Sequence, residues 1–216
     1  MLHRRWILGF AAAAPALLRL AEARAADQPS PGQQTPGEPS MAELTSPRSL
    51  GNPNAPAKVT EFFSLTCTHC AAFQRETFPK VKSDLVDIGK LLLIYHDFPL
   101  DRVALVAAMV ARALPPDRYE AFITTLFATQ DRWAFARNVD PTAELEKLAL
   151  LAGMSDEVFK ATIANQQLAN FIGVEEKEAQ DKYNVDSTPT FLCNGKIHAG
   201  EMTYDAFADF IKSATK

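Results

Sequence analysis

The sequence has only three cysteines in 216 residues, so it cannot be a small scaffold held together by several disulfides. It also lacks an excess of positive charge, because the formal net charge is −4. Residues 1–25 hold four basic groups and one acid, which leaves 18 basic and 25 acidic residues in the rest. This balance excludes a nucleic-acid-binding protein, which needs a basic surface. There is no internal repeat, and the apolar run Trp6–Leu18 is shorter than the ~20 residues that span a bilayer.

The N-terminus has the order of a secretory signal peptide. His3–Arg5 is a short basic region, Trp6–Leu18 is apolar, and Ala23–Ala25 is a small-x-small cleavage site. We therefore expect a signal peptide over residues 1–25 and a mature periplasmic chain that starts at Ala26. The paired arginines fit either the Sec route or the twin-arginine route. An uncleaved anchor helix is the alternative.

The next part of the chain is predicted to be a linker followed by a βαβ unit. Residues 26–50 carry five prolines among Gln, Ser and Gly, which is typical of an extended, solvated linker. Lys58–Ser64 is rich in β-branched and aromatic residues, and Leu91–His96 is a continuous apolar run; both predict buried strands. Ala71–Ile88 between them predicts a helix with a kink at Pro79. Two strands joined by a helix are expected to be parallel.

A helical block is predicted over about 101–172, starting with an apolar helix at Arg102–Leu114. Large apolar residues then recur at helical spacing, which indicates core packing: Tyr119, Phe122, Ile123, Leu126 and Phe127. Asp140-Pro141 and Ser155 mark the starts of two further helices.

The C-terminal part returns to alternating elements. Gln167–Tyr183 predicts a helix, Thr190–Cys193 and Lys196–Ala199 predict a hairpin around Asn194-Gly195, and Tyr204–Ser213 predicts a closing helix. The order β-α-β, helical block, α-β-β-α indicates an α/β fold.

The chemistry is expected at Cys67-Thr68-His69-Cys70, where a strand passes into a helix. Free N–H groups and the helix dipole at that point stabilise a thiolate at Cys67. The thiolate is the nucleophile in thiol–disulfide exchange, and a protonated His69 would stabilise it further. Cys70, one helical turn later, can attack a mixed disulfide at Cys67 and release the partner.

Two other interpretations of the cysteine pair are weaker. A zinc site would need two more ligands from Cys193, His69, His96 and His198, and no second pair with suitable spacing exists. A purely structural disulfide over so short a loop restrains little chain entropy. We therefore predict no metal and no cofactor other than the redox-active disulfide Cys67–Cys70. Cys193 is expected to be a small buried core residue.

Several motifs together resemble the DsbA-like branch of the thioredoxin superfamily. They are Gly51–Pro56, Glu61–Ser64, Cys67–Cys70, Ser187–Phe191 and Asn194–Lys196, and the similarity covers about Ser49 to Lys216. The resemblance implies a thioredoxin fold over 51–216, with the helical block as an inserted domain. Thr68 replaces the proline that the family commonly has there, which bears on the redox potential.

The resemblance also assigns roles to three residues outside the cysteine motif. Pro189 matches the family's cis-proline beside the cysteines, and the backbone of Thr188 would bind an extended substrate as an added strand. Glu61 matches the family's buried acid, and burial should raise its pKa so that it can relay protons to Cys70. The alternative for Glu61 is an edge-strand glutamate in water. His96 and His198 are given no role.

The leading prediction of function is a monomeric periplasmic thiol:disulfide oxidoreductase that donates disulfides to reduced or misoxidised exported polypeptides. The family implies a membrane quinone-linked thiol oxidase that restores the disulfide. The first alternative is an isomerase or reductase of the same superfamily, kept reduced by a reductase, which Thr188 before Pro189 favours. The second is a redox-inert periplasmic binding module. The linker composition of residues 26–50 favours the monomeric oxidase, since isomerases carry a dimerisation domain or an oligomerising stalk before the fold.

Overall fold

The computed structural model describes residues 37–215, which form a mixed sheet with helices on both faces. In chain order the strands are β1 (Arg48–Gly51), β2 (Ala57–Phe63), β3 (Leu91–Asp97), β4 (Thr190–Cys193) and β5 (Lys196–Ala199). They lie in the order β1-β3-β2-β4-β5, with β2 parallel to β3 and the other neighbours antiparallel. The fold is therefore the predicted α/β fold, and β2, which leads to the cysteine motif, is the central strand. The predicted signal peptide lies outside the described residues.

The connection from β2 to β3 is helical, as predicted, but it begins earlier and is less regular. It consists of α2 (Thr68–Ala72), the π-helical segment η1 (Phe73–Thr77), α3 (Phe78–Val81) and the π-helical segment η2 (Lys82–Val86). Pro79 has no N–H to donate to a helix, and η1 lies directly before the α3 turn that contains it. At the predicted kink, the helix thus changes from α-helical to π-helical hydrogen bonding in the residues just before Pro79.

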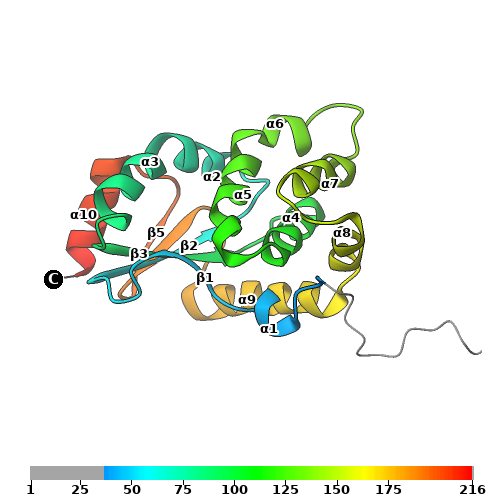
Figure 1. Cartoon of the computed structure of the whole chain (residues 1–216). Helices are drawn as coiled ribbons and strands as arrows, with labels where there is room; N and C mark the ends of the chain where they lie inside the picture. Colours follow the sequence, from blue (N-terminus) through cyan, green and yellow to red (C-terminus); the bar gives the residue numbers. More distant parts are fainter. Residues whose placement is uncertain (1–36, 216) are drawn as a thin grey trace, which may run out of the picture. The chain divides into compact units, whose positions relative to one another are not determined.

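The helical block follows β3 and consists of five helices. They are α4 (Arg102–Ala113), α5 (Pro116–Ala128), α6 (Gln130–Trp133), α7 (Pro141–Leu151) and α8 (Asp156–Ile163). The side chains of Asp101, Asp140 and Ser155 cap α4, α7 and α8 by accepting backbone N–H groups, two of them as the sequence predicts. The predicted apolar stripe of α5 is buried throughout. Figure 1 shows the block at one end of the sheet.

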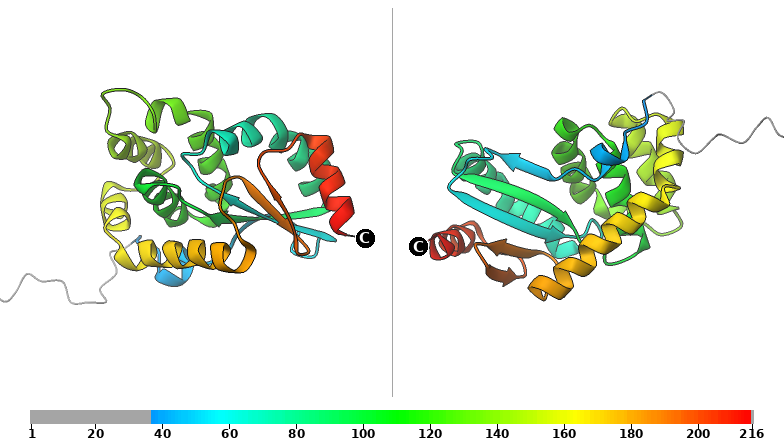
Figure 2. Two further views of the ribbon diagram at one scale, coloured as in Figure 1. Left: turned by 180° about the vertical axis from the view of Figure 1, so that it is seen from behind. Right: turned by 90° about the horizontal axis from the view of Figure 1, so that it is seen from below.

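Two cores form on the two faces of the sheet. On one face, under α2, α3 and α10 (Tyr204–Ala214), the ring centroid of Phe73 lies 4.7 Å from that of Phe191 and 5.7 Å from that of Phe207. On the other, Phe62 packs with Ala179 and Val185. Ala179 belongs to α9 (Gln166–Tyr183), which Figure 2 shows running along this face from the helical block. The predicted boundary at residue 172 therefore falls inside one continuous helix.

The prediction of a solvated linker over residues 26–50 is wrong for its second half. Met41–Leu44 form α1, with a capping box between Ser40 and Glu43, and Arg48–Gly51 form β1, which pairs with β3. The Arg48 side chain is 2 % exposed, and its guanidinium donates to the carbonyls of Glu43 at 3.1 Å and Arg112 at 2.7 Å. These hydrogen bonds hold the segment against α4, so residues 41–51 belong to the folded domain.

The chain between residues 37 and 215 contains no helix with the length and apolar character needed to cross a bilayer.

Candidate active site around Cys67 and Cys70

Cys67 occupies the N-cap of α2, as the sequence predicts. Its backbone is extended, with φ of −81° and ψ of 122°, and its Sγ accepts the backbone N–H of Cys70 at 3.4 Å. Cys67 N donates to Ser64 O at 3.0 Å, which turns the chain from the end of β2 into the helix. Cys67 is 7 % exposed and Cys70 is fully buried, and both are free thiols. Of the two sulfurs, Cys67 is therefore the one that can meet another molecule.

The loop before β4 lies against the Cys67 sulfur. The Thr188–Pro189 peptide bond is cis, as the resemblance predicts. The thiol of Cys67 donates to Thr188 O at 3.2 Å. The Thr188 hydroxyl is buried, and it has no hydrogen-bond partner among the described residues. It is a donor available to the sulfur once the sulfur ionises, a contribution that the sequence analysis missed.

The environment of the two sulfurs separates their titration. Hydrogen bonding from the Cys70 side chain, the Thr188 side chain and the backbone N–H groups of Cys70 and His69 lowers the pKa of Cys67 to about 5, against the opposing effect of burial. Burial raises the pKa of Cys70 well above its ordinary value, and the nearby Cys67 and Glu61 raise it further. At pH 7 Cys67 is therefore mainly a thiolate, while Cys70 keeps its proton.

Glu61 is a buried acid beneath the motif, and the alternative of an edge-strand glutamate in water is excluded. It is 2 % exposed and stands on the central strand β2, paired with Tyr95 on β3 and Phe191 on β4. Its Oε2 has no hydrogen-bond partner among the described residues. Burial, and secondarily the charge of Cys67, raises the pKa of Glu61 to about 8. The side chain is thus a neutral acid near pH 7.

His69 lies at the surface, beside Glu201. Its side chain is 70 % exposed, and its Nδ1 lies 3.5 Å from Oε1 of Glu201 in the segment before α10. Its backbone N–H is what contributes to the lowered pKa of Cys67. The predicted electrostatic effect of the His69 ring stays a prediction.

Two polar side chains of the helical block reach the loop that carries Cys67, and the sequence analysis missed both. The Gln130 amide donates to Leu65 O at 2.8 Å and to Cys67 O at 3.1 Å. Thr66 Oγ1 donates to Oδ2 of Asp101 at 2.7 Å. For Gln130 the sequence did contain a signal, because this polar residue continues the helical spacing of the apolar stripe of α5. In the structure Gln130 is 5 % exposed.

The remaining cysteine and histidines lie outside this arrangement. Cys193 is fully buried on β4, as predicted, and burial raises the pKa of its thiol. The His96 ring packs on Phe62 with centroids 4.7 Å apart, and the His198 ring lies 6.1 Å from that of Phe210. Within residues 37–215, no three His, Cys, Asp or Glu side chains form a cluster suited to a metal ion.

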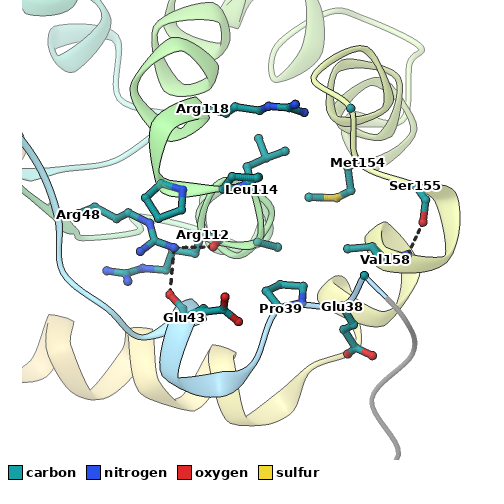
Figure 3. Close-up of a pocket in the computed structure, with 15 residues that line it drawn as sticks. Glu38, Pro39, Glu43, Arg48, Arg112, Leu114, Arg118, Met154, Ser155 and Val158 are labelled. Carbon is teal, nitrogen blue, oxygen red and sulfur yellow. Dashed lines mark hydrogen bonds between the residues drawn. The ribbon is translucent and has the colours of Figure 1, made fainter.

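A pocket of about 590 Å³ lies elsewhere, between α1, α4, α5 and the start of α8. Figure 3 shows Leu114, Met154 and Val158 lining it, with Arg112 and Arg118 also at its edge. None of the predicted site residues lines this pocket, so it is separate from the cysteine motif.

Comparison with known proteins agrees with this geometry. Residues 43–213 match the family model described as Thioredoxin. A Rickettsia conorii protein with the provisional name protein-disulfide oxidoreductase is 25 % identical over 76 % of this chain and 59 % of its own length. The chain thus spans about 59 % of the length of this curated relative. Disulfide bond formation protein D of Bacillus subtilis is 24 % identical over 77 % of this chain and 76 % of its own.

Among solved structures, a doubly substituted variant of alpha-DsbA1 from Wolbachia pipientis is 30 % identical, with a TM-score of 0.72 over 79 % of this chain and 90 % of its own. The family match begins at residue 43, within the segment that the structure adds to the predicted domain. The chain therefore belongs to the thioredoxin family, within its DsbA-like branch.

Proposed function

We propose that the protein is a periplasmic thiol:disulfide oxidoreductase that donates the Cys67–Cys70 disulfide to exported polypeptides. The observation that carries the proposal is the position of the Cys67 sulfur at the start of α2, where it accepts the Cys70 N–H. A sulfur at this point forms a stable thiolate, and a stable thiolate is a good leaving group.

The first step is attack by a substrate thiolate on Cys67 Sγ of the oxidised protein. The Cys67–Cys70 bond breaks, a mixed disulfide forms between substrate and Cys67, and Cys70 leaves as a thiolate that takes up a proton. A second substrate thiolate then attacks its own sulfur in the mixed disulfide and expels Cys67 as a thiolate. The substrate loses two electrons and gains a disulfide, and the protein gains both electrons as the reduced cysteine pair.

The thiolate also sets the direction of the exchange. The pKa of Cys67 is lowered in the folded protein, so this thiolate adds stability to the reduced form at high pH, and the gain disappears as pH falls towards about 5. At pH 7, two pH units above that value, the gain is about 3 kcal/mol. A stabilised reduced form corresponds to an oxidising disulfide, which favours the role of disulfide donor.

Glu61 is proposed as the acid that exchanges a proton with Cys70. It is neutral near pH 7 and buried beneath the motif, and it is among the groups that raise the pKa of Cys70. The Cys70 thiolate that leaves in the first step has little access to water, because Cys70 is fully buried. A nearby carboxylic acid supplies the proton that this sulfur needs.

The Thr188–Pro189 loop is proposed to bind the substrate backbone. Thr188 O lies 3.2 Å from the Cys67 sulfur, so a polypeptide joined to Cys67 must pass this loop. An extended segment can pair with such a loop as an added strand.

The proposal is tested by mixing oxidised protein with a reduced peptide that contains two cysteines. We expect one peptide disulfide per protein, with loss of activity in Cys67→Ser and trapped mixed disulfides in Cys70→Ser. If protein with both cysteines alkylated had the same effect on the peptide as untreated protein, the proposal would be overturned. The redox-inert binding module would then be favoured.

The equilibrium potential of the Cys67–Cys70 couple, measured in glutathione buffers, distinguishes the isomerase or reductase alternative from the disulfide donor. A potential near about −120 mV indicates a strong oxidase, and one near about −270 mV indicates a reductase. The proposed partner depends on which of these roles the protein has. A membrane quinone-linked oxidase restores the disulfide of a donor, whereas a reductase keeps an isomerase reduced. Export, and with it the periplasmic location, depends on the predicted signal peptide over residues 1–25.

A further inference from the structure

The loop between β2 and α2 is held by an amide from the inserted helical block. Gln130 donates one hydrogen bond to Leu65 O at 2.8 Å and another to Cys67 O at 3.1 Å. Both acceptors are backbone carbonyls of buried residues, with Leu65 1 % and Cys67 7 % exposed. The two hydrogens of one side-chain amide therefore connect two positions of the same short loop.

Gln130 itself is fixed in place by the packing of α5 and α6. It is 5 % exposed and is the first residue of α6. Three residues later Trp133 is 1 % exposed, and its indole N–H donates to Leu126 O at 2.8 Å. Phe127 packs edge-on against Phe63 of β2, with ring centroids 6.0 Å apart. The amide is thus attached to a packed surface that also contacts the central strand.

The orientation of the Cys67 peptide decides where its sulfur lies. Cys67 O also accepts the N–H of Ala71 at 3.1 Å, a backbone hydrogen bond in the first turn of α2. The Cys67 sulfur lies 3.4 Å from Cys70 N and 3.2 Å from Thr188 O, so a small rotation of this residue changes both contacts. Loss of the Gln130 amide would leave buried carbonyls with fewer donors, and the loop would move to satisfy them.

We propose that Gln130 is a positioning residue, by which the helical block holds the Cys67 sulfur in its reactive orientation at the start of α2. The proposal deepens the proposed function and rests on it, because the orientation matters only if Cys67 exchanges disulfides. On this proposal the inserted block takes part in the chemistry through Gln130, which holds the backbone carbonyl of Cys67.

The test compares Gln130→Met with a matched control, Gln74→Met, in the otherwise unchanged chain. Gln74 is also a buried glutamine, 4 % exposed, and its amide donates to Thr124 Oγ1 at 2.9 Å. Both variants remove an amide that joins the thioredoxin part to the helical block, but only Gln130 contacts the loop of Cys67. The readout is the ultraviolet absorbance of the thiolate against pH on reduced protein, which needs no substrate and is independent of the proposed oxidase activity.

We expect Gln130→Met to shift the Cys67 transition to higher pH, with a roughly threefold to tenfold decrease in the ionisation constant of the thiol. Gln74→Met should lower stability and leave the transition where it is in the wild type. An unchanged transition in Gln130→Met, or an equal shift in both variants, would overturn the proposal. If Gln130→Met does not fold, Gln130→Asn keeps an amide that is one methylene too short to reach both carbonyls, and the same shift is expected.

Discussion

Replacing Glu61 with glutamine removes the buried acid and keeps the shape of the side chain. Glu61 is 2 % exposed on the central strand, and its pKa is about 8. An unfolded chain ionises a glutamate near pH 4.3–4.5, so between that pH and about 8 folding takes up a proton. A raised carboxyl pKa therefore makes the free energy of unfolding fall as pH rises through this window.

The size of the effect follows from the pH interval. At about 1.4 kcal/mol per pH unit, keeping Glu61 neutral in the folded state costs about 3–4 kcal/mol at pH 7. The glutamine amide that replaces the carboxyl group has no ionisation to suppress. We expect Glu61→Gln and wild type to have similar free energies of unfolding near pH 4.5, and the variant to be more stable by about 3–4 kcal/mol at pH 7.

Denaturant unfolding of reduced protein at several pH values between 4.5 and 8 measures this difference. Glu178→Gln is the matched control, because Glu178 is an exposed glutamate on α9, and it should leave the pH dependence as in wild type. The charge of Cys67 also raises the pKa of Glu61, so the difference should be smaller in oxidised protein. A stability difference that does not change with pH would refute the reasoning.

Three further substitutions test other parts of the account. Thr188→Val removes the hydroxyl available to the thiolate and should raise the pKa of Cys67 by less than about 1 unit, read from thiolate absorbance. Cys193→Ala should keep most peptide-oxidation activity and lose about 1 kcal/mol in denaturant unfolding, through the small void in the core. Arg48→Met should cost about 2 kcal/mol by the same method, because the carbonyls of Glu43 and Arg112 lose their donor.

The parts of the fold that depend on local pattern were predictable from the sequence. Lys58–Ser64 and β2 agree within one residue at each end, because a segment rich in β-branched and aromatic residues is a strong signal for a strand. The apolar stripe of α5 is buried as predicted, since helical spacing alone places its members on one face. The caps Asp140 and Ser155 were also correct, because capping is a short-range interaction.

The segment of α1 and β1 was missed because its contacts are distant in the sequence. Its prolines and polar residues suggested a linker. Arg48 is buried because its guanidinium reaches Arg112 O, 64 residues away, and because β1 pairs with β3. The capping-box pattern Ser40-x-x-Glu43 was a local signal for α1, but no local pattern shows where Arg48 and β1 pack.

In the candidate site, too, local motifs and the resemblance identified some residues, whereas contacts between residues distant in the sequence were missed. The motif identified Cys67 and Cys70, and the resemblance identified Glu61 and Pro189. Gln130 lies 63 residues from Cys67, and its contact with the loop depends on how the helical block packs. The predicted effect of the His69 ring on the sulfur stays a prediction; the Nδ1 of this exposed side chain lies 3.5 Å from Oε1 of Glu201.

Thiolate absorbance against pH on reduced wild type, Cys67→Ser and Cys70→Ser tests the central assignment most directly. We expect a transition near pH 5 in wild type that disappears in Cys67→Ser and remains below the ordinary cysteine value of about 8.5 in Cys70→Ser. A low transition that survives in Cys67→Ser and disappears in Cys70→Ser would make Cys70 the reactive sulfur and contradict the account.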